Sequence, residues 1–281
     1  MFELESGMTA SRKDTVSRNI PSVSEAVLPH PGPVALPQGL PDTGINTRLQ
    51  DLISLIENRI LHLQAKTRLR EPMSGLTHCL GAVLAAVGLV ALVLETTEPF
   101  RPWHLVTYSI FGISMILLYV VSTLFHWLPL SAKKILQLRK LDHIMIFVFI
   151  AATYTPFCLI PFRGPFGWSV FACIWVIAAL GTIFKLYWIK VPKKICLSIY
   201  FFAGFFSLVA TGHILRTLQP WAIFWLVVGG LSYTIGAIFY ALEKSDDTPP
   251  FFGYHEIFHI FVMLGSSAHF WLIYRYLIKF N

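Results

Sequence analysis

The feature that most constrains this chain is a series of apolar segments, each about as long as a bilayer is thick. A helix needs roughly 20 mostly apolar residues to cross the hydrocarbon core. Seven segments meet that length, and short connections containing prolines and basic residues separate them. The predicted fold is therefore all-α, a seven-transmembrane helix bundle. We place the spans near residues 75–95, 103–126, 141–161, 166–188, 195–215, 220–242 and 255–277.

The composition supports a membrane protein and argues against several other classes. The chain is 55% hydrophobic and only 13% charged, whereas charged residues make up about 25% of a typical soluble domain. Its net charge is +7, but the basic residues gather in short loops, where membrane orientation explains them better than nucleic acid does. Four cysteines without Cys-x-x-Cys spacing suggest neither a disulfide framework nor a thiolate metal site.

The amino-terminal quarter of the chain has a different character. Residues 1–45 are rich in Pro, Ser and Gly without apolar periodicity, which predicts a disordered leader, and they lack the pattern of a signal peptide. Residues 46–70 carry apolar residues at helical spacing with charges between them, which predicts an amphipathic helix. A membrane surface and a second copy of the chain both suit its apolar face. Residues 71–281 form the predicted seven-span domain.

Basic residues are divided unequally between the two sides of the predicted bundle. Thirteen near the segment ends fall on the side of the amino terminus and five on the other. The positive-inside rule therefore places the amino terminus and the amphipathic helix in the cytoplasm and the carboxyl terminus outside, in the inner (plasma) membrane if the organism is bacterial. The thirteen are Arg59, Lys66, Arg68, Arg70, Lys133, Lys134, Arg139, Lys140, Lys185, Lys190, Lys193, Lys194 and Lys244; the five are Arg101, Arg163, Arg216, Arg275 and Lys279.

Two histidines at the start of the last segment indicate a metal site. His255 and His259 are four residues apart, so in a helix they project from one face. A catalytic zinc ion usually takes three protein ligands, and so a third donor is needed. The topology puts His126, at the end of the second span, at the same depth, and it is the candidate third ligand. Three other histidines lie at different depths: His104, His213 and His269.

The same predicted layer holds Ser122, Asp142 and His78. Ionisable groups are costly at membrane depth and tend to mark function. Simpler interpretations remain open, because Ser122 can bond a carbonyl one turn earlier, Asp142 can pair with Arg139, and a single buried histidine is more often a packing residue. Three histidines in one layer favour a metal.

The string from His255 to His259 also matches H-E-x-x-H, the zinc metalloprotease signature in which Glu256 would act as general base. Such proteases generally find their third ligand downstream. Here only His269, and no Asp, Glu or Cys, follows the motif. The protease interpretation is therefore weak.

Several motifs together resemble the hemolysin III family, which belongs with the progestin and adipoQ receptors and so with the adiponectin receptors. The resemblance spans about residues 70 to 280 in order and does not cover the leader or the amphipathic segment. The motifs are Glu71 with Thr77-His78, Ser122-x3-His126, Leu141-Asp142-His143, Ala152-Thr153-Tyr154-Thr155-Pro156 and Tyr254-His255-Glu256-Ile257-Phe258-His259.

The resemblance implies a zinc ion (Zn2+) held by His126, His255 and His259. In the receptor relatives an aspartate and a serine lie around the zinc-bound water, which maps to Asp142 and Ser122 as catalytic residues. The receptor relatives carry ceramidase activity. A membrane lipid with an amide-linked acyl chain is therefore the first substrate class expected, with hydrolysis by zinc-activated water as the reaction.

Two other functions remain open. The family's name suggests a pore-forming cytolysin in which the metal is structural, and a membrane-lipid sensor or receptor would also suit the site. A pore within one chain should have a polar stripe through the whole span, whereas charge and histidine gather at one end here. This asymmetry favours a buried site, and an oligomeric pore stays open.

Overall fold

The computed structural model describes residues 48–56, 59, 69–188, 191–243 and 252–280. The predicted leader lies outside these residues. Of the predicted amphipathic helix, residues 48–56 are helical and expose their leucines, while most of the remainder lies outside the described residues. The chain divides into two units at Ile56, and the second unit holds the whole helix bundle.

Within the described residues, seven helical segments are long and apolar enough to cross a membrane, which confirms the all-α prediction. The fifth crossing is built from three pieces, because a 3-10 stretch interrupts its helix. The segments are α2 (Pro72–Leu94), α3 (Pro102–Trp127), α4 (Ala132–Leu159), α5 (Pro165–Tyr187), α6 (Lys193–Phe205) with η1 (Phe206–Ala210) and α7 (Thr211–Thr217), α8 (Pro220–Leu242), and α9 (Tyr254–Tyr276) with η2 (Leu277–Lys279).

Proline marks most of the helix starts. It occupies the first turn of α2, α3, α5 and α8, where its fixed φ suits a helix and its missing N–H would have no intrahelical partner. The third crossing differs from the prediction, since α4 begins at Ala132 rather than near residue 141. The added turns are rich in Lys, Leu, Gln and Arg, which are good helix formers, so the helix extends beyond its apolar part.

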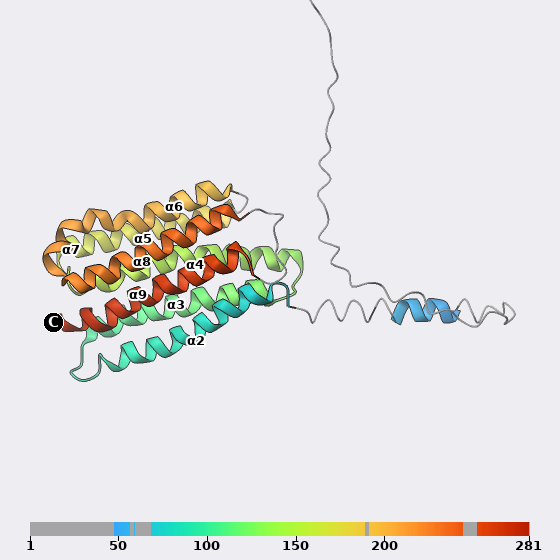
Figure 1. The fold of residues 1–281 in the computed structure, drawn as a ribbon, viewed down its shortest axis with the longest axis horizontal. Coiled ribbons are helices and arrows are strands. Elements are labelled where there is room, and N and C mark those ends of the chain that lie inside the picture. The colour runs from blue at the N-terminus through green and yellow to red at the C-terminus, as the bar shows by residue number, and fades with distance from the viewer. Residues whose placement is uncertain (1–47, 57–58, 60–68, 189–190, 244–251, 281) are drawn as a thin grey trace, which may run out of the picture. The chain divides into compact units, whose positions relative to one another are not determined.

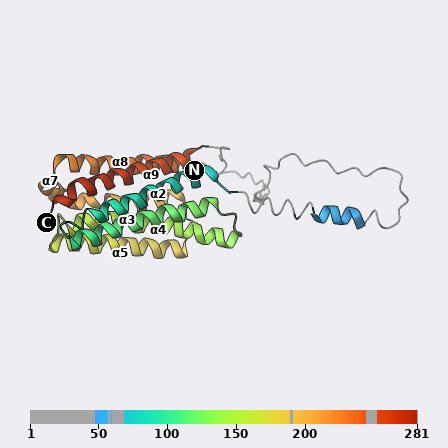
Figure 2. The same cartoon turned by 90° about the horizontal axis from the view of Figure 1, so that it is seen from below.

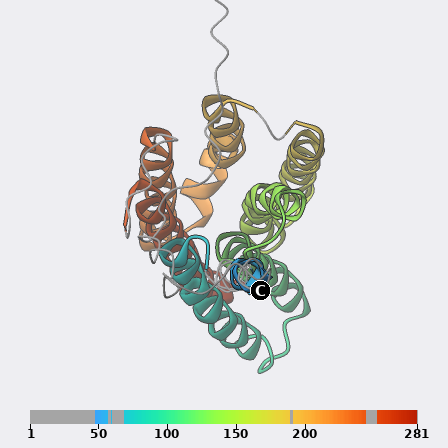
Figure 3. The ribbon, with the colours of Figure 1, turned by 90° about the vertical axis from the view of Figure 1, so that its right-hand side faces the viewer.

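The helices of the bundle run lengthwise beside one another (Figures 1 and 2). Viewed end-on, they follow one another around the bundle from α2 to α9 (Figure 3). Consecutive helices from α2 to α5 pack together, and α9 packs against both α8 and α2, which closes the arrangement. Residues at the start of α2, the end of α3 and the start of α9 therefore meet at one end of the bundle.

The bundle is apolar on its outside, as lipid contact requires. α2 exposes a full row of large aliphatic side chains, while its buried face carries mainly small residues and a histidine. Small residues let membrane helices approach closely, and a Cβ added at Gly81 would lie 3.1 Å from the Tyr119 ring of α3. Soluble monomeric proteins rarely expose an apolar surface of this extent. The exposed row is Leu76, Leu80, Val83, Leu84, Val87, Val90 and Leu94.

We predict that Gly167→Ala destabilises the bundle by about 1–3 kcal/mol, because the added Cβ would overpack the α4–α5 junction. It would lie 2.2 Å from the carbonyl oxygens of Cys158 and Phe162, which are backbone atoms and cannot rotate away. The matched control is Gly230→Ala in α8, where a Cβ meets nothing within 4 Å. Thermal unfolding in detergent measures both, and equal midpoints for the two variants would contradict the packing.

Candidate metal centre

Three histidines from two helices meet at one end of the bundle. His126 ends α3, and His255 and His259 begin α9. Each offers one ring nitrogen, and the three nitrogens lie within 4.8 Å of one another. His126 and His259 are each only 2% exposed, and His255 is half-buried. The structure thus brings together the three histidines that the sequence analysis predicts as metal ligands.

The start of α2 holds His126 in place. The Nδ1 atom of His126 is hydrogen-bonded to the Glu71 carboxylate, which also accepts a 2.7 Å bond from Arg70. Burial opposes ionisation of Glu71, but the hydrogen bond to His126 and the charge of Arg70 outweigh it and lower the Glu71 pKa. A carboxylate at Nδ1 fixes the ring and its tautomer, leaving the Nε2 lone pair free for a metal.

The same segment closes the end of α3. The last carbonyl groups of a helix have no intrahelical partner. Here Arg70 donates its guanidinium to the Phe125 oxygen at 2.9 Å, and the Glu71 amide donates to the His126 oxygen at 3.0 Å. Arg70 and Glu71 therefore cap α3 and orient its histidine at once.

His259 is oriented by α2 as well. Its Nδ1 atom lies 3.2 Å from the Ser74 carbonyl oxygen and 3.1 Å from Thr77 Oγ1. A carbonyl oxygen only accepts hydrogen bonds, so we infer that the proton of His259 is on Nδ1. Its Nε2 lone pair is then free for a metal.

His255 contacts an ion pair between α6 and the end of α8. Its Nδ1 atom is 3.4 Å from Glu243 Oε1, an ion-pair separation without the alignment of a hydrogen bond. The other oxygen of Glu243 accepts a 2.7 Å bond from Lys193. Burial raises the pKa of Glu243, but contacts with His255 and Lys193 outweigh it and lower this pKa to about 2. Glu243 is thus a carboxylate at neutral pH.

The separation of the facing nitrogens suits a shared ion. His255 Nε2 and His126 Nε2 are 3.3 Å apart. Two ligands about 2.05 Å from a tetrahedrally coordinated metal are separated by about 3.3 Å. Without a metal, the same distance fits a hydrogen bond in which one of the two nitrogens is protonated. The three histidines therefore form a site that can hold a metal ion.

Glu256 is occupied by structural contacts. It accepts a 2.8 Å bond from the Gly253 amide at the start of α9 and a further bond from the Ser74 hydroxyl of α2. Both contacts anchor the start of α9, so Glu256 is not a free base beside the histidines. The contacts of Glu256 thus argue, like the sequence, against a metalloprotease in which this residue is the general base.

The two predicted catalytic residues flank the cluster, and their roles stay predictions. Ser122 is buried in α3 one turn before His126, and no hydrogen bond of its hydroxyl is seen among the described residues. Asp142 of α4 lies 3.5 Å from His143 Nδ1.

Four further histidines were placed by depth, and the structure agrees with each placement. His78 stacks face to face on His259 at 3.6 Å. His104 contacts the Leu277 carbonyl oxygen at the opposite end of α9. His213 stacks on Phe166, and His269 lies beside the Leu226 carbonyl oxygen further along the bundle.

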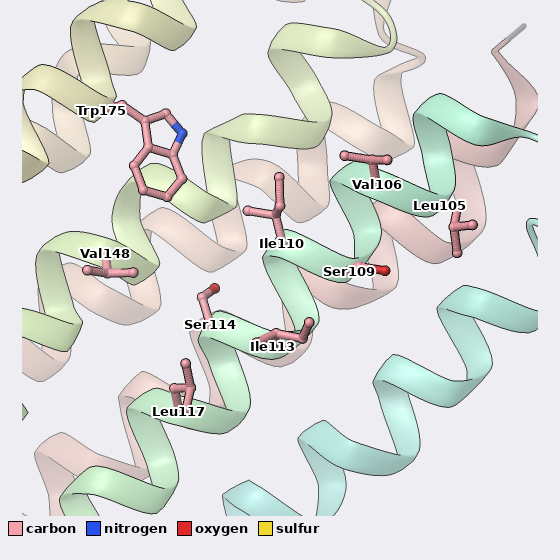
Figure 4. A pocket seen from close by; sticks show the side chains of 9 residues that line it. All are labelled: Leu105, Val106, Ser109, Ile110, Ile113, Ser114, Leu117, Val148 and Trp175. Carbon is pink, nitrogen blue, oxygen red and sulfur yellow. The ribbon is translucent and has the colours of Figure 1, made fainter.

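An apolar groove of about 490 Å³ lies between α3, α4 and α5 (Figure 4). Its lining on α3 runs from Leu105 to Leu117. Leu117 precedes His126 by nine residues, roughly 13 Å along a helix. The groove and the three-histidine site are therefore separate features.

Sequence reasoning missed the residues that orient the histidines. In the sequence Glu71 stands out only as part of a motif and Lys193 only as one of the basic residues that set the orientation, while Glu243 and Ser74 belong to neither group. One signal was present: Glu243 ends the sixth span, and the ends of consecutive antiparallel helices meet. A carboxylate there faces the start of the seventh span and its first histidine.

The fold and the site define a multi-pass integral membrane protein with a buried three-histidine centre that can hold a metal ion. A family model described as Haemolysin-III related matches residues 66–270, more than half of the chain. The chain belongs to this family.

Individual relatives agree with the match. Hemolysin-3 of Bacillus cereus is 35% identical over 209 residues, which cover 74% of this chain and 92% of that protein. The Hemolysin-3 homolog of Bacillus subtilis (strain 168) is 34% identical over 210 residues, covering 74% and 95%. Monocyte to macrophage differentiation factor of Homo sapiens is 33% identical over 186 residues, covering 63% and 73%.

We predict that Glu243→Gln weakens metal binding about tenfold, because a carboxylate beside the outer nitrogen of a ligating imidazole orients that ring. The matched control is Glu95→Gln at the other end of the bundle, where Glu95 accepts a 3.0 Å bond from Tyr274. Competition with a metal chelator on purified protein measures both affinities. Equal loss in the two variants would show that Glu243 has no specific role.

Proposed function

We propose that this protein is a zinc-dependent hydrolase of membrane lipids that cleaves an acyl bond, with an amide the first linkage to test. One observation carries the proposal. Among the described residues three imidazole nitrogens converge, and no fourth His, Cys, Asp or Glu ligand joins them. Structural zinc sites usually have four protein ligands, whereas catalytic sites have three and keep one position for water or substrate.

Zinc fits this donor set. Imidazole nitrogens suit several transition metals, but a set of three histidines is a common catalytic zinc site. The oriented Nδ1 sides of all three rings, toward Glu71, Glu243 and Ser74, are what such a site needs. When bound there, zinc lowers the pKa of a coordinated water to about 7 and so supplies hydroxide near neutral pH.

Two residues of this chain would handle the proton and the developing charge. Asp142 accepts the proton of the attacking water and returns it to the leaving amine, which is general acid–base catalysis. Ser122, one turn before His126, donates its hydroxyl to the oxygen on which negative charge develops. Ser122 is supported by its place one turn before His126, and Asp142 by the predicted depth that it shares with the three histidines.

The orientation follows from the basic residues and forms part of the proposal. With the amino terminus in the cytoplasm, the three histidines lie at the level of the inner leaflet. The expected partner is a membrane lipid, with its acyl linkage at the histidines and its tail among the helices or in the bilayer.

A cytolysin is the second candidate, because two relatives bear the name Hemolysin-3 or Hemolysin-3 homolog. The interior of one chain does not favour a pore. At the end opposite the histidines, Leu272, Ile273 and Leu277 are fully buried and pack with other apolar side chains. Lysis would therefore require an assembly of several copies.

We predict that His126→Ala, His255→Ala and His259→Ala each lower the zinc content of the purified protein to well below that of the wild type. Each removes one of three ligands, and the others cannot hold the ion alone. His104→Ala, a buried histidine at the far end of the bundle, should keep its zinc. Elemental analysis measures the content, and unchanged stoichiometry in all three ligand variants would refute the assignment.

We also predict that Asp142→Asn keeps zinc but loses about 10²–10⁴-fold in lipid turnover, because the isosteric amide cannot accept a proton. Release of fatty acid from amide- and ester-linked lipids in reconstituted vesicles measures it, beside dye leakage from the same vesicles. Equal turnover by both proteins removes Asp142 from the mechanism. If neither the wild type nor Asp142→Asn releases fatty acid and the vesicles leak dye, the result would favour the cytolysin over the hydrolase.

A further inference from the structure

His78 of α2 is a fourth imidazole at the three-histidine site. It is 4% exposed and stacks on His259 with ring centroids 3.6 Å apart and planes 14° apart. On another side its ring meets the Tyr119 ring at 5.0 Å. Tyr119 shares a 2.5 Å hydrogen bond with Ser266 of α9, and this bond fixes the position of the Tyr119 ring that packs against His78.

The stacking shows that His78 is not a ligand of the same ion in this arrangement. The ring nitrogens that converge are those of His126, His255 and His259, and within the described residues no nitrogen of His78 joins them. His78 instead lies over the face of the His259 ring, with the two ring centroids 3.6 Å apart. His78 therefore lies beside the three-histidine cluster and could contact a molecule bound there.

Neither ring nitrogen of His78 has a hydrogen-bond partner among the described residues, although both are buried. An unpaired buried polar group costs about 1–3 kcal/mol. Phenylalanine would make the same stack without that cost. A histidine in this position therefore indicates a partner that the protein itself does not supply.

We propose that His78 donates a hydrogen bond to the acyl oxygen of the lipid held at the three-histidine site. This inference rests on the proposed function and deepens it by adding a substrate-contacting residue. A neutral imidazole has one N–H donor and one acceptor nitrogen. The carbonyl oxygen of an amide or ester, and the carboxylate of the released fatty acid, are acceptors that the N–H can bind.

The test uses the full-length, zinc-loaded protein in lipid nanodiscs and dodecanohydroxamic acid, an acyl analogue that binds metals, as probe. His78→Phe keeps the stack and removes both nitrogens. We expect it to keep its zinc, to unfold at the same temperature as the wild type or higher, and to bind the probe at least about tenfold more weakly, the loss of one hydrogen bond to a charged group. Calorimetric titration measures the affinity.

Two further variants separate the hydrogen bond from the packing. His269→Phe alters another buried histidine with an unpaired nitrogen, one that lies further along α9 beside the Leu226 oxygen, and it should leave probe affinity unchanged. His78→Gln restores an N–H donor and should recover most of the affinity. Should the phenylalanine variant not fold, His78→Leu takes its place and is judged by the same ratio.

The outcomes are distinct. If His78→Phe binds the probe as tightly as the wild type, the inference is overturned. It is also overturned if His78→Gln loses as much probe affinity as His78→Phe, because the effect would then come from the aromatic ring and not from the N–H donor. Absence of probe binding by the zinc-loaded wild type overturns it as well. Probe binding that depends on His78, in a protein that hydrolyses no lipid tested, upholds the inference and refutes the hydrolase.

Discussion

The rest of the structure depends on one constraint: the three imidazoles that converge inside this bundle must be held in place by contacts on the outer side of each ring. Each histidine of the centre has Nδ1 directed at an oxygen atom, and these oxygens come from three places, the start of α2, its first turn, and the end of α8. Since the carboxylates of Glu71 and Glu243 are in turn paired with Arg70 and Lys193, five helices converge on one small volume.

The position of this network at one end of the bundle also provides partners for the backbone groups at the helix ends. Helix ends leave backbone groups without partners, and in a membrane these need polar contacts. Arg70 and Glu71 supply them to α3 while Glu71 orients His126, and Glu256 supplies one to α9 while it ties that helix to Ser74. Further along the bundle most buried polar side chains bond to backbone carbonyl oxygens, as Ser114 does to Phe111 and Tyr108 to Ile273.

The seven spans were predictable because bilayer thickness fixes the length of an apolar segment. The depth of the histidines was predictable too, because each crossing reverses direction and so levels His126 with His255 and His259. The early start of α4 was not, since its first turns are charged and only their helix-forming residues carry the signal. The contact between Glu243 and Lys193 was not predictable either. It depends on how the start of α6 packs against the end of α8, and the hydrophobic periodicity of the sequence carries no information about that packing.

The depth of the site also bears on the lipid-hydrolase proposal. α9 has 23 residues and is therefore about 35 Å long, slightly more than the roughly 30 Å of a hydrocarbon core. His255 in its first turn then lies near the edge of that core and His259 one turn inside it. In a membrane lipid the acyl linkage occupies this boundary, with the headgroup outside and the chain within. The proposed hydrolase would therefore meet the linkage without drawing the lipid out of the bilayer.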